Sequence, residues 1–185
     1  MALARLSTIA SFWIRPLDER VDETAVFPCL SDQISRHNLH RQHLKYIYLS
    51  LEAPSLAAPT ITWASQQDWS LPNLVSFRLK LSCDALSDET FAHLQQLIDH
   101  FRDLPKLQAL CIDGDYKRDE MHHSWESILD ISEVLASASI NQLWIKGFRL
   151  VLNRSAATSL KKLALIFCEL TRESFVNLLL QNNGR

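Results

Sequence analysis

Three histidines, His37, His40 and His43, are the first candidates for metal chemistry because they stand three positions apart. On a helix, neighbouring members of such a series share a face, but the third member drifts around the helix from the first. No acid or thiol stands where it would complete the tetrahedral set that zinc prefers. We therefore expect these histidines to lie on a solvated or partly buried helix face, and we expect no metal site.

The segment 113–120 opens like a calcium-binding loop, with Asp113 and Asp115 on either side of a glycine. Lys117 and Arg118 then occupy positions at which an EF-hand needs an oxygen ligand and a glycine. The pattern therefore favours an extended surface loop that mixes acidic and basic side chains.

Enzyme motifs are scarce in this chain. It has three glycines in 185 residues, whereas loops that cradle phosphate need glycine where backbone amides close on the ligand. This excludes a dinucleotide fingerprint, a P-loop and the nucleophile elbow of hydrolases. His122, His123 and Glu126 lack the one-turn spacing of a zinc-protease helix. A cysteine–histidine pair distant in sequence stays open, so a small hydrolase is the enzymatic alternative, but we expect no enzyme and no cofactor.

The composition indicates one folded domain, because 47% of the residues are hydrophobic and the formal net charge is −2. Chains of this size bury roughly 70% of their unfolded surface. The near-neutral charge argues against a nucleic-acid partner, and no apolar run approaches the roughly 18 residues of a membrane span. Four cysteines without a close pair favour a cytoplasmic or nuclear protein. Residues 1–15 are interpreted as an amphipathic helix or, alternatively, a targeting segment.

The strongest signal in the sequence is an internal repeat. Residues 79–94 align without gaps with residues 163–178, at an offset of 84 residues. In each copy, a Leu-x-Leu pair places two side chains on one face of a strand. Ser87 and Thr171 then stand as helix N-caps, and apolar residues follow at helical spacing. Each copy therefore predicts a strand, a turn and a helix.

Similar apolar pairs recur along the chain and predict five parallel strands. The spacings between them, 30, 31, 33 and 20 residues, are irregular. The leading residues of the pairs are Leu49, Leu79, Leu110, Leu143 and Leu163.

The connections between these strands differ in kind. Residues 30–43 and 124–135 carry helical patterns, as do residues 178–185. By contrast, the proline-containing stretch 57–73 predicts an irregular connection. The stretch 150–160 is long enough only for a turn.

With these features the chain resembles leucine-rich-repeat proteins of the helical type, such as ribonuclease inhibitor and the repeat regions of F-box proteins. The run from Leu160 to Leu170 matches the family's core pattern Leu-x-x-Leu-x-Leu-x-x-Cys-x-Leu, with Cys168 at its Asn/Cys position. The resemblance covers about residues 30 to 185. The irregular repeat lengths are similar to those of fungal F-box-associated proteins. An ordinary α/β domain with leucine-rich strands is the alternative.

The resemblance implies an α/β fold: a short solenoid with parallel strands on a concave face and helices on a convex face. Residues 1–43 would form an N-terminal helical segment, and residues 44–185 about five irregular repeats, with truncation at the C-terminus left open. Residues 16–21 echo an F-box start only faintly, so we do not assign an F-box there.

The residues between and after the core leucines face outward on the concave side of such a fold. Aromatic residues and arginine among charged neighbours are typical of a protein-binding surface. Trp144 leads, because a tryptophan opposite the core side has no obvious partner within its own repeat; packing under a neighbouring loop or chain is the alternative. The candidate partner-binding residues are Tyr48, Glu52, Arg78, Lys80, Asp113, Trp144, Lys146 and Lys162.

The sequence therefore predicts a non-enzymatic module that binds another protein through its concave face, with no nucleic-acid or membrane partner. By resemblance, its setting is the substrate-recognition part of an F-box-type ubiquitin-ligase receptor. The alternative is a structural fragment of a longer repeat protein with no independent activity.

Overall fold

The computed structural model describes residues 11–14, 44–51, 54–66, 71–82, 87–115, 128–152 and 160–176. They form an α/β fold in which the paired strands run parallel. The strands are β1 (Ser11–Ile14), β2 (Tyr46–Leu51), β3 (Ser76–Ser82), β4 (Ala109–Asp115), β5 (Ile128–Asp130), β6 (Gln142–Lys146), β7 (Arg149–Val151), β8 (Lys162–Ile166) and β9 (Glu169–Leu170). The helices are α3 (Pro54–Ser65), α4 (Asp88–Phe101) and α5 (Ser132–Ala136), and residues 172–176 are also helical.

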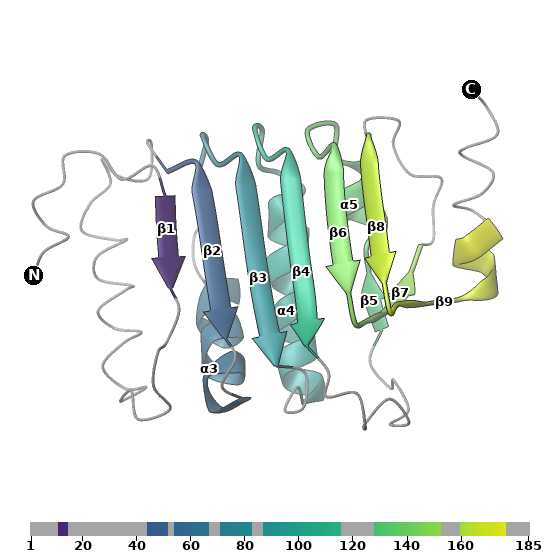
Figure 1. The fold of residues 1–185 in the computed structure, drawn as a ribbon, viewed down its shortest axis with the longest axis horizontal. Helices are drawn as coiled ribbons and strands as arrows, with labels where there is room; N and C mark the ends of the chain where they lie inside the picture. Colours follow the sequence, from purple (N-terminus) through teal and green to yellow (C-terminus); the bar gives the residue numbers. More distant parts are fainter. Residues whose placement is uncertain are drawn as a thin grey trace, which may run out of the picture.

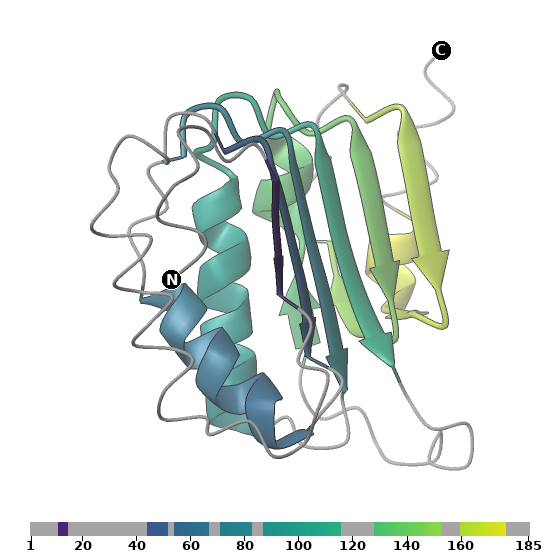
Figure 2. The same cartoon turned by 60° about the vertical axis from the view of Figure 1, so that its left-hand side comes forward.

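Within the described residues, six strands form one sheet whose spatial order, β1-β2-β3-β4-β6-β8, follows the chain (Figure 1). Three short strands form a second sheet, β5-β7-β9. Parallel neighbours need a crossover connection, and α3 and α4 lie in two of these crossovers. Figure 2 shows both helices and the three-stranded sheet on the same side of the six-stranded sheet. We call the opposite side of the six-stranded sheet the open face.

The core lies between the six-stranded sheet and the helices. Leu49 of β2 pairs with Leu79 of β3, and Leu79 lies level with Ile112 of β4 and Ile145 of β6. None of these four side chains is more than 2% exposed. The alternation of strand side chains thus confirms the inward face that the Leu-x-Leu pairs predict.

The predicted repeat offset is wrong by two residues at the level of the strands. An offset of 84 would place Leu79 level with Leu163, but the register through β4 and β6 places Phe77 there. A shift of two residues keeps the same side chains on the inner face. It also lets Phe77 pack on Phe101 of α4, with ring centroids 4.4 Å apart.

The same offset holds at the two helix starts, where both predicted N-caps are confirmed. Ser87 Oγ accepts a hydrogen bond from the Thr90 amide at 3.2 Å, and Thr171 Oγ1 accepts one from the Ser174 amide at 3.2 Å. In each pair the two hydroxyl oxygens also lie within hydrogen-bond distance, at 3.0 and 2.6 Å. The repeat therefore extends to the geometry of its turns.

The irregular connection predicted at 57–73 is wrong for its first half, because Pro54–Ser65 form α3 with Pro59 inside it. Pro54 stands at the first helical position, where the missing amide hydrogen costs nothing. Ile61 and Ala64 are buried on this helix. This packing offsets the cost of the interior proline, which a local reading of the sequence takes as decisive.

The helix predicted at 124–135 is wrong at residues 128–130, which form β5, and α5 begins only at Ser132. The reason lies on α4. The Asp130 amide donates to Gln95 Oε1 at 2.8 Å, and Gln95 Nε2 donates to the Asp130 carbonyl at 2.9 Å. The side chain of Gln95 thus bonds β5 as a neighbouring strand would.

The N-terminal helical segment predicted over residues 1–43 is wrong at Ser11–Ile14, which form β1 and pair with β2. The backbone of β2 offers hydrogen bonds to an adjacent strand, and no local pattern in the sequence shows that long-range partner. The helices predicted at 30–43 and 178–185, the three spaced histidines and the segment 116–127 lie outside the described residues. No helix in the described ranges is long and apolar enough to cross a membrane.

Candidate functional site

The open face carries three rows of side chains, each running across the strands from β2 to β8. One row is Tyr46, Ser76, Ala109, Gln142 and Lys162; the next is Tyr48, Arg78, Cys111, Trp144 and Ala164; the third is Ser50, Lys80, Asp113, Lys146 and Ile166. Parallel pairing therefore brings together most of the candidate residues that the sequence predicts. Lys162 lies at the edge strand β8, and Glu52 lies outside the described residues.

Arg78 is at the centre of the middle row, between two aromatic rings. Its guanidinium carbon lies 5.2 Å from the centroid of the Tyr48 ring and 5.5 Å from that of Trp144. Such contacts contribute roughly 0.5 to 2 kcal/mol each, most where water is excluded. The sequence analysis names all three residues but misses that they form one cluster. Their shared row depends on the register of strands some 30 residues apart.

The Arg78 guanidinium also has an unmet hydrogen-bonding group. Its Nε is buried and has no hydrogen-bond partner within the described part of the chain. Trp144 remains 38% exposed. The aromatic cluster is thus held in place on its own side and still accessible from solvent.

Asp113 and Lys146 form an ion pair in the third row. Lys146 Nζ lies 3.2 Å from Asp113 Oδ1, and Asp113 is 7% exposed. Lys80 is level with Asp113 on the adjacent strand. The carboxylate therefore serves as an internal partner for Lys146 and presents little of itself to a binding molecule.

Two described cysteines are poor candidates for thiolate chemistry. Burial raises the pKa of Cys111; the Arg78 charge opposes this shift, and the Asp113 charge adds to it. Burial also raises the pKa of Cys168, although nearby backbone hydrogen bonds oppose the shift. Cys168 Sγ lies 3.3 Å from the Ile145 carbonyl, to which it donates. Both thiols are protonated at neutral pH, whereas the thiolate is the nucleophilic form.

A serine and a histidine meet between α3 and α4, a contact that sequence spacing does not reveal. Ser65 Oγ lies 3.0 Å from His93 Nδ1 and donates to the Thr62 carbonyl at 2.9 Å. Because its proton goes to that carbonyl, Ser65 accepts a hydrogen bond from His93 instead of donating its proton to the ring. The pair joins two helices and does not prepare a nucleophile of the serine–histidine kind.

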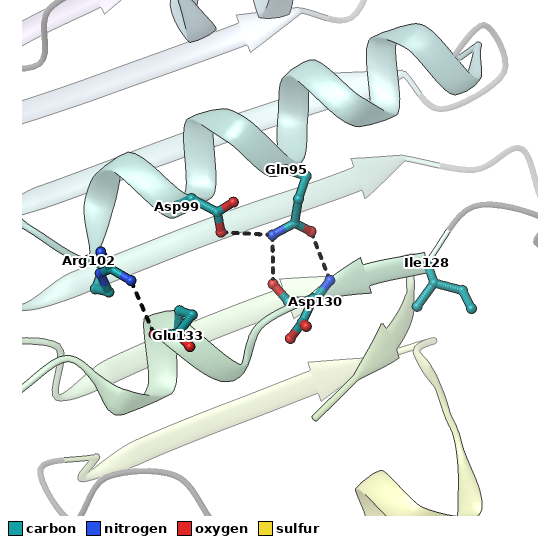
Figure 3. Close-up of a pocket in the computed structure, with 6 residues that line it drawn as sticks. All are labelled: Gln95, Asp99, Arg102, Ile128, Asp130 and Glu133. Carbon is teal, nitrogen blue, oxygen red and sulfur yellow. Dashed lines mark hydrogen bonds and ion pairs between the residues drawn. The ribbon is translucent and has the colours of Figure 1, made fainter. Parts of the chain in front are cut away.

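An open hollow of about 500 Å³ lies on the helix side of the molecule, between α4, β5 and α5. Figure 3 shows Gln95 bonded to both Asp99 and the Asp130 backbone, and Arg102 paired with Glu133. Its polar groups are therefore largely used to attach β5 and α5 to α4. No group of three or more metal-ligating side chains is found in the described ranges.

The open face is thus the part of the described molecule where exposed aromatic rings and charged groups gather without closing on each other. Comparisons with known proteins add nothing to this geometry: no protein-family model, curated protein or solved structure matches the chain.

Proposed function

We propose that the chain is a non-enzymatic recognition module that binds another protein on the open face of its six-stranded sheet. The observation that carries this proposal is the cluster of Tyr48, Arg78 and Trp144 on the face away from the helices. Tryptophan, tyrosine and arginine are the residues that most often dominate the energetics of protein interfaces.

We further propose that the module has a leucine-rich-repeat arrangement, for which the last described units give support. Gly147 and Phe167, 20 residues apart, follow β6 and β8 and share positive φ angles of 78° and 50°. The backbone then enters β7 and β9, which pair with each other. The same strand–turn–strand path is therefore used twice.

Side chains also join each of these units to its predecessor. Cys168, at the Asn/Cys position of the pattern, bonds the carbonyl of Ile145 on the preceding strand. Ser174 Oγ accepts from the Leu152 amide at 2.8 Å. Contacts in which one unit completes the hydrogen bonds of the previous one are what a stacked-repeat fold requires.

The resemblance to F-box proteins leads us to propose substrate recognition in a ubiquitin ligase as the wider setting. This rests on the repeat pattern alone, since fold is a weak guide to function. Recovery of a cullin-ligase adaptor with the tagged chain from its native cells would support this setting. A different stoichiometric partner would remove it and leave recognition in place.

Trp144→Asp tests the recognition proposal itself. We expect it to abolish capture of the stoichiometric partner, because a charge replaces the exposed ring beside Arg78. Ile128→Asp is the matched control: Ile128 is 43% exposed, against 38% for Trp144, and lies on the helix side. Thermal melting followed by circular dichroism checks that both variants stay folded. Equal capture by folded Trp144→Asp would overturn the proposal.

A further inference from the structure

The charges of the open face do not follow those of the whole chain. The chain has a formal net charge of −2, yet four cations, Arg78, Lys80, Lys146 and Lys162, share this face with Asp113, the acid in the three described rows. Asp113 is 7% exposed and paired with Lys146. The charge that the face presents outward is therefore positive.

From this we propose that the partner docks an acidic, extended peptide segment across the strands, with a carboxylate on Arg78. The inference rests on the proposed function, because it specifies the chemistry of the partner on the same surface. Charge complementarity of this kind steers encounter and fixes orientation.

Arg78 is the residue best prepared for an anion. The rings of Tyr48 and Trp144 restrict its side chain, so that little rotamer freedom is left to lose on binding. They also displace water from the guanidinium, which strengthens its attraction to a carboxylate. Its buried Nε finds no acceptor in the described ranges. A carboxylate on the terminal amino groups would form the strong, charge-assisted hydrogen bond that this arginine lacks.

The register sets the spacing of the acids in such a segment. Lys80 and Lys146 lie in one row with β4 between them, which places their backbones roughly 10 Å apart at about 4.8 Å per strand. Arg78 and Lys80 are two residues apart along β3, roughly 7 Å. An extended peptide spans these distances in two to three residues. We therefore expect at least two acids separated by one or two residues.

A single-stranded nucleic acid is the competing occupant, because it also seeks cations and aromatic rings. Such binding uses ring faces on which bases stack. Here Arg78 lies over the faces of both Tyr48 and Trp144. The Asp113 carboxylate, between the two lysines of its row, would repel a phosphate chain. The described residues therefore favour a peptide.

The test selects a displayed library of random peptides, about a dozen residues long, on the full chain. We expect enriched peptides to be rich in Asp and Glu at the spacing given above. Arg78→Met and Lys80→Met should weaken a synthetic version of the leading peptide about tenfold or more. Arg102→Met is the matched control, because Arg102 pairs with acids on the helix side, and it should leave the affinity unchanged. High salt should also weaken binding.

Each other outcome has a defined meaning. Neutral or basic peptides that depend on Trp144 would overturn this inference and leave the proposed function standing. Acidic peptides that bind Arg78→Met as well as the wild type would overturn the inference too. Binding of an oligothymidylate at lower concentration than any peptide, with the same dependence on Arg78, would overturn it in favour of nucleic acid. No peptide that depends on the open face would count against both proposals.

Discussion

Arg78 and Arg102 lie on opposite sides of the six-stranded sheet and have opposite surroundings. Arg102 donates to Asp103 and to Glu133, each at 3.2 Å, and these hydrogen bonds raise its pKa. Arg78 instead lies between two aromatic rings, with its Nε unbonded in the described ranges. Polar side chains are thus present on both sides. The sides differ in whether those side chains already have partners.

This difference separates a scaffold from a binding surface. The hollow on the helix side has the shape of a ligand site, but Gln95 and Arg102 spend their hydrogen bonds within it. The open face is flatter, yet its central cation is unpaired by any described acid. Shape alone would choose the hollow, and hydrogen-bond satisfaction chooses the sheet.

The largest expected effect tests the scaffold side. Gln95→Ala removes one hydrogen bond to Asp99 and two to the Asp130 backbone, which leaves a strand-edge amide and carbonyl without partners. We expect the free energy of unfolding, measured in urea, to fall by about 2 kcal/mol. Peptide affinity at the open face should stay unchanged.

Gln96→Ala is the control for this change, because Gln96 is an exposed neighbour on the same helix. It should alter the free energy of unfolding by less than about 0.5 kcal/mol. If both variants unfold alike, the bonds of Gln95 to β5 contribute no stability and the scaffold reading of the hollow is wrong.

A smaller effect is expected for Arg78→Met. It loses two cation–π contacts, but it also removes a buried Nε that no described group accepts. The two changes oppose each other, so the free energy of unfolding should fall by less than about 1 kcal/mol. Arg102→Met should leave it unchanged within error, because exposed ion pairs add little. A loss for Arg78→Met as large as that of Gln95→Ala would make Arg78 a structural residue.

The sequence predicts one part of this comparison much better than the other. Leu-x-Leu spacing identifies the inner face of each strand, and Ser87 and Thr171 identify the helix starts, because both signals are local. Alternation also identifies Arg78 and Trp144 as outward residues. Their meeting depends on a register in which β3 is shifted by two residues from the predicted offset. No local pattern contains that shift.

The helix side is harder to predict for the same reason. Gln95 looks like an ordinary exposed helix residue, and residues 128–130 look helical until Gln95 bonds their backbone from 35 positions away. Pro59 looks like a helix breaker until α3 packs against the core. These contacts are tertiary, and they override local preference at positions where that preference is weak.

The smallest expected effect measures how close Arg78 is to its neighbour on β4. Burial raises the pKa of Cys111 and the Arg78 charge partly offsets that rise. Arg78→Met should therefore raise this pKa further and move the midpoint of Cys111 alkylation to higher pH, read residue by residue from mass spectra over a pH series. A thiol pKa raised by folding adds stability below the unfolded value, near 8.5, that is lost as pH rises through the folded value.

Cys168 provides the internal control in the same spectra, because its pKa has no contribution from Arg78. Its alkylation midpoint should not move, and a parallel shift of both thiols would indicate a general change in the fold. A Cys111 midpoint that stays fixed or falls in Arg78→Met would mean that the guanidinium does not act on the centre of the open face. The aromatic cluster would then lack the electrostatic role on which the acidic-peptide inference depends.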